Sequence, residues 1–117
     1  MIASRAINLS LLRELQSLFH KEASELIELY VNSARKKIAM LHKALEEENL
    51  DNFRAAAQEL RYRSIDIGAV QFSFCCLSLE MAAQERCIER LQQLTVLLEN
   101  QFHSIYQELE SLMRVRA

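Results

Sequence analysis

The sequence lacks proline and tryptophan, and it has a single glycine among its 117 residues. Proline and glycine interrupt helices and form the tight turns that join strands, so their near-absence disfavours a strand-rich fold and favours long helices. Half of the residues are hydrophobic, enough for one continuous core, and the length suits a single domain. We therefore expect one all-α domain over residues 1–117.

An excess of charge of either sign is also missing. Lys and Arg number 14 against 16 acidic residues, which gives a net charge of −2. Without a basic field the chain is not expected to bind nucleic acid. Charged residues interrupt every apolar cluster well before the roughly 20 residues that a membrane span needs, and the first residues show no signal-peptide pattern. These absences predict a cytoplasmic protein with no membrane partner.

Cysteine is scarce, with Cys75, Cys76 and Cys87 in the whole chain. An odd number that includes an adjacent pair does not suit a disulfide framework, so reduced thiols are expected. Cys76 falls on a predicted buried stripe, whereas Cys75 falls beside that stripe and could be reactive. The three histidines are scattered along the chain, and we predict neither a metal site nor a cofactor.

Apolar residues recur at steps of three and four, which predicts helices with one buried stripe each. Short connections between long amphipathic helices predict an antiparallel up-down four-helix bundle, with a short additional N-terminal helix ending near Phe19 that caps one end. Asp51 is the predicted N-cap of the helix that Gly68 ends. The predicted core positions are Ile27, Tyr30, Ala34, Ile38, Leu41, Leu45; Phe53, Ala57, Leu60, Ser64, Ile67; Ala69, Phe72, Cys76, Leu79, Ala83; and Leu91, Leu94, Leu98, Gln101 or Phe102, Ile105, Leu109, Leu112.

Residues 57–69, with the sequence AQELRYRSIDIGA, resemble the signature A-H-x-L-K-G-S-S-x-x-x-G-A of the histidine phosphotransfer (HPt) family. The matching positions are Ala57, Leu60, Ser64, Gly68 and Ala69, and Arg61 keeps the charge of the family lysine. Residues 72–83 are similar to the family's second motif, L-x-x-x-C-x-x-L-E-x-x-A. The resemblance implies the bundle fold and docking onto receiver domains, whose phosphorylation pocket is acidic.

Three departures from that signature argue against transfer of a phosphoryl group. Gln58 stands at the position of the phosphoacceptor histidine, and a carboxamide nitrogen is not a nucleophile because its lone pair is delocalised, unlike that of a neutral imidazole. Tyr62 replaces the glycine that leaves room over the imidazole in the family, and Arg63 replaces the first serine. We therefore expect a pseudo-phosphotransfer module that is not an enzyme.

Two further stripes point away from the predicted core. Ala55, Gln58, Tyr62 and Ile65 share one outward face, and Val70, Phe74, Leu77 and Met81 share another. The second stripe is either covered by the N-terminal helix, rotated into the core, or exposed as an interface. The candidate binding residues are Arg54, Gln58, Arg61, Tyr62, Ile65, Phe74 and Leu77.

The leading hypothesis is a non-catalytic module that binds a receiver domain or a hybrid sensor kinase and modulates two-component phosphorelay signalling. Arg54 and Arg61 would suit the acidic pocket of a receiver domain. The alternative is a helical adaptor or dimerisation module, such as a homodimer, with no phosphorelay partner. A relay through His42 or His103 is the least favoured hypothesis, because both are interpreted as surface or boundary histidines.

Overall fold

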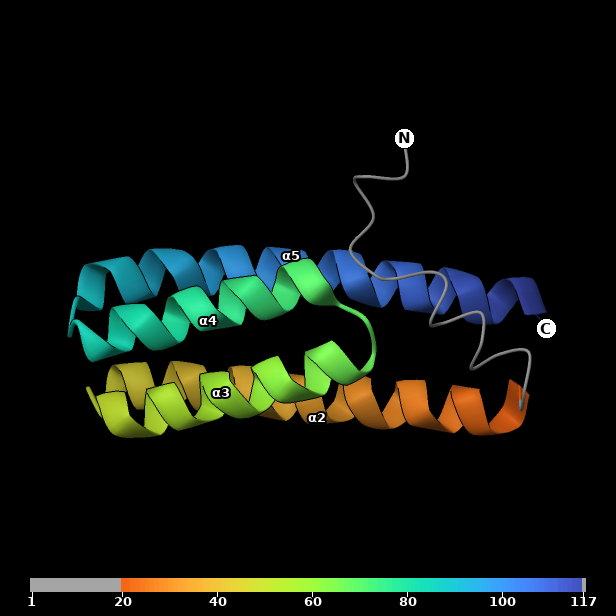
Figure 1. Ribbon diagram of the computed structural model, residues 1–117, viewed down its shortest axis with the longest axis horizontal. Helices are drawn as coiled ribbons and strands as arrows, with labels where there is room; N and C mark the ends of the chain where they lie inside the picture. Colours follow the sequence, from red (N-terminus) through yellow and green to blue (C-terminus); the bar gives the residue numbers. More distant parts are fainter. Residues whose placement is uncertain (1–19, 117) are drawn as a thin grey trace.

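A computed structural model describes residues 20–116 of the chain, and the side chains of residues 24–111. It consists of the helices α2 (His20–Glu46), α3 (Leu50–Asp66), α4 (Val70–Gln84) and α5 (Ile88–Arg116) (Figure 1). Successive helices run in opposite directions and are joined by three-residue connections, so the predicted antiparallel up-down bundle is confirmed. The predicted N-terminal helix lies outside the described residues.

The four helices form a closed ring of neighbours, in which α3 packs against α2 and α4, and α5 packs against α4 and α2. The first and last described helices are much longer than the two between them. Helix α2 has 27 residues and α5 has 29, whereas α3 has 17 and α4 has 15. In Figure 1, α2 and α5 therefore continue past the turn that joins α3 to α4. None of the described helices is long and apolar enough to cross a membrane.

The ends of α3 confirm one sequence prediction and correct another. Gly68 has a φ of 82°, the left-handed conformation expected of a glycine that follows a helix. The predicted N-cap Asp51 is wrong: the side-chain oxygen of Asn49 accepts the backbone N–H of Asn52 at 3.1 Å. Glu48 takes a positive φ of 52° in the turn after α2, and α3 begins at Leu50, before the predicted N-cap. Asp51 instead lies in the first turn, where a carboxylate favours the helix dipole.

The predicted core positions of α3 and α4 are all buried. Between the two alternatives in α5, Phe102 is buried and Gln101 is only half-buried. The ring of Phe102 lies 6.5 Å from that of Tyr30 and 6.0 Å from that of Phe72, measured between centroids, so aromatic contacts connect α2, α4 and α5. Leu45 and Leu94 are partly buried at the margin of the core, and the side chain of Leu112 lies outside the described residues.

Ser64 is a polar residue inside this core. Its hydroxyl donates to the carbonyl of Leu60 at 2.7 Å, and its oxygen lies 2.9 Å from the hydroxyl of Tyr30 on α2. Since the single proton of Ser64 is already used, the Tyr30 hydroxyl donates to Ser64. Burial raises the pKa of Tyr30 above its ordinary value, so this phenol stays a neutral donor even in alkaline solution. Ser64, which matches the family signature, therefore links α3 to α2 through a buried hydrogen bond.

Candidate functional site

Gln58, which stands where the resembling signature has a histidine, lies on the outward face of α3. Gln58 is exposed there, and its stripe neighbours Ala55, Tyr62 and Ile65 are exposed as the sequence predicted. Tyr62 is 52% exposed and Ile65 is 49% exposed, so both leave a large apolar area at the surface. The predicted α3 stripe is therefore a real surface of the described molecule.

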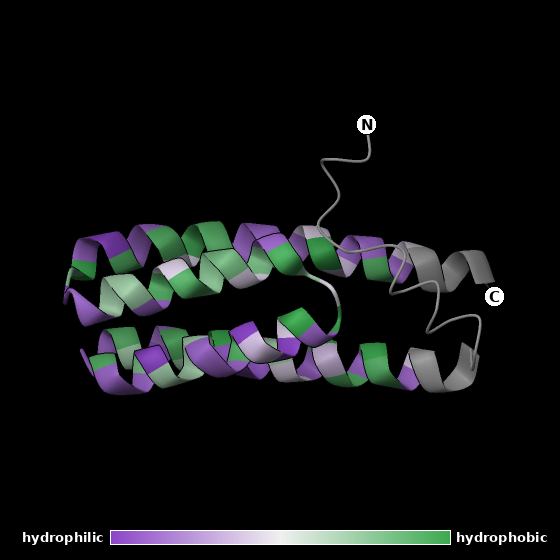
Figure 2. Ribbon diagram, in the orientation of Figure 1, coloured by the Kyte–Doolittle hydropathy of each residue, from purple (hydrophilic) through white to green (hydrophobic). Residues whose placement is uncertain are grey.

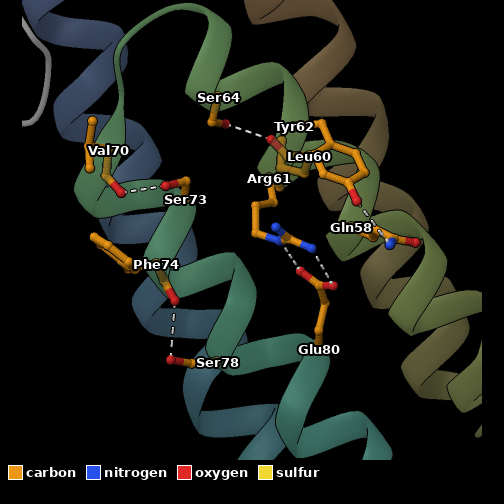
Figure 3. Close-up of polar contacts among 10 residues, drawn as sticks. All are labelled: Gln58, Leu60, Arg61, Tyr62, Ser64, Val70, Ser73, Phe74, Ser78 and Glu80. Carbon is orange, nitrogen blue, oxygen red and sulfur yellow. Dashed lines mark hydrogen bonds and ion pairs between the residues drawn. The ribbon is translucent and has the colours of Figure 1, made fainter.

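Gln58 and Tyr62 are in direct contact (Figure 3). The Gln58 amide nitrogen donates a hydrogen bond to the Tyr62 hydroxyl over 3.3 Å, across one turn of α3. The tyrosine side chain thus occupies the space beside position 58 that a glycine at position 62 would leave open. The geometry offers an amide and a phenol as hydrogen-bonding groups, and no imidazole.

Arg61, which the sequence placed in the candidate binding set to meet an acidic partner, is already paired with an acidic residue of this chain. Its guanidinium donates to both carboxylate oxygens of Glu80 on α4, from Nε at 2.5 Å and from Nη2 at 3.1 Å (Figure 3). The two side chains are 21% and 9% exposed, so the pair lies largely between α3 and α4. This bidentate contact neutralises Arg61 within the chain, and the hydrogen bonds that its guanidinium donates to Glu80 raise the pKa of Arg61.

The same guanidinium also contacts Tyr62. Its central carbon lies 4.8 Å from the centroid of the Tyr62 ring, which is the distance of a cation–π contact. A continuous chain of contacts therefore runs from Glu80 on α4 through Arg61 and Tyr62 to Gln58 on α3. Because the ion pair with Glu80 fixes the Arg61 side chain, the Arg61 guanidinium can fix the position of the exposed Tyr62 ring.

Sequence reasoning missed the Arg61–Glu80 pair, although a signal for it was present. Glu80 is the one charged residue of α4, and it sits among the buried positions of that helix. A buried carboxylate requires a cation or several hydrogen-bond donors, since an unpaired buried charge is very unfavourable. The basic position in the first motif, Arg61, was the available cation.

Arg54, the other basic residue of the predicted site, is exposed near the start of α3. Within the described part of the chain it has no ion pair. It is therefore the cation of the predicted set whose charge faces solvent. Arg54 and Arg61, which the sequence placed in similar roles, have different environments.

The second outward stripe lies on α4 and is exposed. Phe74 is 64% exposed, with Val70 at 47%, Met81 at 55% and Leu77 at 36%. The alternative in which this stripe rotates into the core is wrong, because the opposite face of α4 fills the core. The alternative in which the N-terminal helix covers it concerns residues outside the described range. In Figure 3, Val70 and Phe74 point away from Gln58 and Tyr62, so the two stripes are separate surfaces.

The two cysteines of α4, Cys75 and Cys76, do not provide a reactive site. Cys75 is buried, and desolvation raises the pKa of its thiol, so the alternative of a reactive Cys75 is wrong. Burial raises the pKa of Cys76 as well, and both thiols remain free. Among the described residues, no group of three or more His, Cys, Asp or Glu side chains is arranged to hold a metal ion.

His42 and His103 are both exposed, as the sequence indicated. The Nε2 of His42 lies 2.9 Å from a carboxylate oxygen of Glu99, and this contact bridges α2 and α5. Neither histidine lies on α3 or α4. The surface that carries the family motifs therefore contains no histidine in the described structure.

Comparison with known proteins gives a fold and no close sequence relative. No protein-family profile matches the chain, and no curated protein sequence matches it. The crystal structure of histidine-containing phosphotransfer protein B from Pseudomonas aeruginosa superimposes with a TM-score of 0.87, at 22% identity, covering 95% of this chain and 96% of that one. A histidine-containing phosphotransfer protein from maize gives a TM-score of 0.88 at 18% identity, covering 100% and 94%. The chain therefore has the fold of the histidine-containing phosphotransfer proteins, as the two motifs implied.

Proposed function

We propose that this protein is a non-catalytic pseudo-phosphotransfer module, which binds a receiver domain or a hybrid sensor kinase and modulates phosphorelay signalling without carrying a phosphoryl group. One observation carries the proposal. The bundle superimposes on phosphotransfer proteins, and its stretch that resembles the family signature has Gln58 in place of the histidine, with the Gln58 amide hydrogen-bonded to Tyr62.

The chemistry of Gln58 supports the loss of transfer. A phosphoryl acceptor needs a lone pair that can attack phosphorus, and an amide nitrogen has none available because its lone pair is delocalised into the carbonyl. Tyr62 adds bulk at the point where the attacking group would have to approach. A protein with this surface can occupy a receiver without accepting its phosphoryl group, and it is not an enzyme in this proposal.

The surface around Gln58 supports docking. Tyr62 and Ile65 present apolar area, and Arg54 presents a positive charge to solvent. Interfaces commonly combine a central aromatic residue with charges at the rim, and a positive rim suits the acidic pocket of a receiver domain. Arg61 contributes by holding the Tyr62 ring in place.

We place this activity in the cytoplasm, where two-component receivers and the catalytic parts of their kinases act. An odd number of cysteines that includes an adjacent pair does not suit a disulfide framework, which agrees with a reducing compartment. The partner is therefore to be sought among cytoplasmic receiver domains.

The test measures binding and labelling in the same samples. The protein is titrated against a panel of receiver domains, with and without phosphorylation, and is then assayed for acid-labile phosphate. We expect binding to at least one receiver and no label. Gln58→His should remain unlabelled, because Tyr62 still crowds the site, whereas Gln58→His with Tyr62→Gly should gain label.

Two results would contradict the proposal. Label on the unaltered protein that is lost on His42→Ala or His103→Ala would show a relocated acceptor. Efficient labelling of Gln58→His alone would show that Tyr62 does not block the site.

The second candidate function is a helical adaptor or dimerisation module with no phosphorelay partner. The Arg61–Glu80 pair favours it, because that pair removes one of the two positive charges that an acidic receiver would meet. If the protein binds none of the receiver domains in the panel, the result would favour this alternative.

A further inference from the structure

The exposed face of α4 carries no charge. Its exposed residues are Val70, Gln71, Phe74, Leu77, Met81 and Gln84. The one charged side chain of the helix, Glu80, is 7% exposed and is neutralised by Arg61. The exposed faces of the other three helices all include charges, for example Glu28 on α2, Arg54 on α3 and Glu99 on α5.

This absence of charge restricts what can cover the α4 face. A charged partner surface would lose water at the contact and gain no opposite charge in return, which is unfavourable. A complementary surface must therefore be uncharged and apolar. Among the described helix faces of this protein, the α4 face alone meets that requirement, so a second copy of α4 is the complement that the molecule itself supplies.

The spacing of the apolar residues also suits self-association. Val70, Phe74, Leu77 and Met81 follow steps of four, three and four, which is the seam of a two-helix contact. The pattern is symmetric about the midpoint between Cys75 and Cys76. Two antiparallel copies related by a two-fold axis at that midpoint would place Phe74 against Leu77 of the partner subunit, and Val70 against Met81 of the partner subunit.

We propose that the protein forms a homodimer in which α4 packs antiparallel against α4 of a second copy, with the two-fold axis crossing the exposed face between Phe74 and Leu77. The dimer surface on α4 is distinct from the surface on α3 that is proposed to bind a receiver domain. It leaves the α3 stripe accessible, because Val70 and Phe74 point away from Gln58 and Tyr62 (Figure 3). A seam of about three helical turns is short, so we expect a reversible dimer with a dissociation constant on the order of micromolar.

The experiment is sedimentation velocity on the full chain, from about 1 to about 200 µM, a range that brackets a micromolar dissociation constant. We expect a concentration-dependent change from monomer to dimer. Phe74→Lys and Leu77→Glu should each weaken dimerisation by at least about tenfold, because each buries a charge against an apolar contact. Leu29→Lys is the matched control: Leu29 is 66% exposed on α2, and its replacement should leave the dimer unchanged.

Mixing the two variants tests the antiparallel arrangement. In a Phe74→Lys and Leu77→Glu heterodimer, the introduced lysine faces the introduced glutamate at one contact, and the native Phe74–Leu77 contact survives at the other. We therefore expect dimerisation to recover in the mixture. A parallel arrangement would set position 74 against position 74, and the mixture would stay monomeric, which would overturn the proposed geometry.

Two further outcomes overturn the proposal as a whole. The unaltered protein remaining a monomer over the full range would exclude the dimer. A lower melting temperature of Phe74→Lys without any change in association would show that residues 1–19 of the same chain cover α4. Neither outcome bears on receiver binding, which is measured separately through Tyr62.

Discussion

The outward faces of α3 and α4 both follow alternating steps of three and four residues, and they differ in chemistry. On α3, Gln58 and Tyr62 combine an amide with a phenol, and charged residues surround them. On α4, the exposed residues are apolar or amide-bearing and none is charged. Figure 2 shows hydrophobic colour along much of α4, whereas α5 alternates between hydrophobic and hydrophilic along its visible length.

The Arg61–Glu80 pair explains how two adjacent helices can differ so much. It removes the charge of α4 from the surface, and it fixes the tyrosine that gives the α3 face its aromatic character. A single ion pair at the contact between two helices thus shapes both surfaces. The comparison teaches that periodicity predicts where a face points, while contacts between helices decide what chemistry it offers.

The largest expected effect tests whether the buried faces of α3 and α4 are equally well packed in the core. Leu60 on α3 and Leu79 on α4 are both fully buried. Replacing either with alanine should cost about 2–5 kcal/mol of unfolding free energy, because each leaves a cavity. Chemical denaturation measures this cost, and Val96→Ala on the exposed side of α5 is the control. A clearly smaller cost at Leu79 would show that α4 is loosely packed.

The next effect concerns partner binding through the α3 face. Tyr62→Ala should weaken receiver binding by about 2 kcal/mol, roughly thirtyfold, since an aromatic residue at the centre of an interface is costly to remove. Tyr62→Phe keeps the ring and loses only the hydrogen bond to Gln58, so its effect should be small. Isothermal titration against the bound receiver measures both. Equal losses in the two variants would mean that the hydroxyl, and not the ring, makes the contact.

A smaller effect is expected from the ion pair that separates the two faces. Glu80→Gln should cost about 1–2 kcal/mol of stability, less than a fully buried pair, because Arg61 keeps some access to water. A double-mutant cycle with Arg61→Gln isolates the coupling between the two side chains. Near-additive single costs would contradict a direct contact. Glu80→Gln should also disturb Tyr62 and weaken receiver binding.

The smallest effect is a pH dependence on the α2–α3 contact. The ion pair with Lys37 lowers the pKa of Glu59, whose side chain is 55% exposed. A lowered pKa in the folded state adds stability above the ordinary pKa of a glutamate, and this stability is lost as the pH falls through the lowered value. For such an exposed pair we expect no more than about 0.5 kcal/mol. Comparing acid unfolding of the unaltered protein and Lys37→Met measures it; identical profiles would exclude the contribution.

Much of the architecture was predictable because it depends on local pattern. The core positions of α3 and α4 and the end of α3 at Gly68 follow from periodicity and from the freedom of glycine at positive φ. The N-cap at Asp51 was wrong because a turn at Glu48 moved the start of the helix, which no periodic pattern reports. Cys75 was expected beside the buried stripe, but packing against neighbouring helices covers it.

By itself, the sequence determined an all-helical bundle, the presence of Gln58 where the resembling signature has a histidine, and which residues point outward on α3 and α4. These properties depend on residue identity and on the helical repeat, and both can be read directly from the sequence. Only the tertiary structure decided that Arg61 binds Glu80, that its guanidinium lies against Tyr62, and that Arg54 is left with the exposed charge. The partner of a charged side chain depends on which residues of other helices lie within a few ångströms of it, and helical spacing carries no information about that distance.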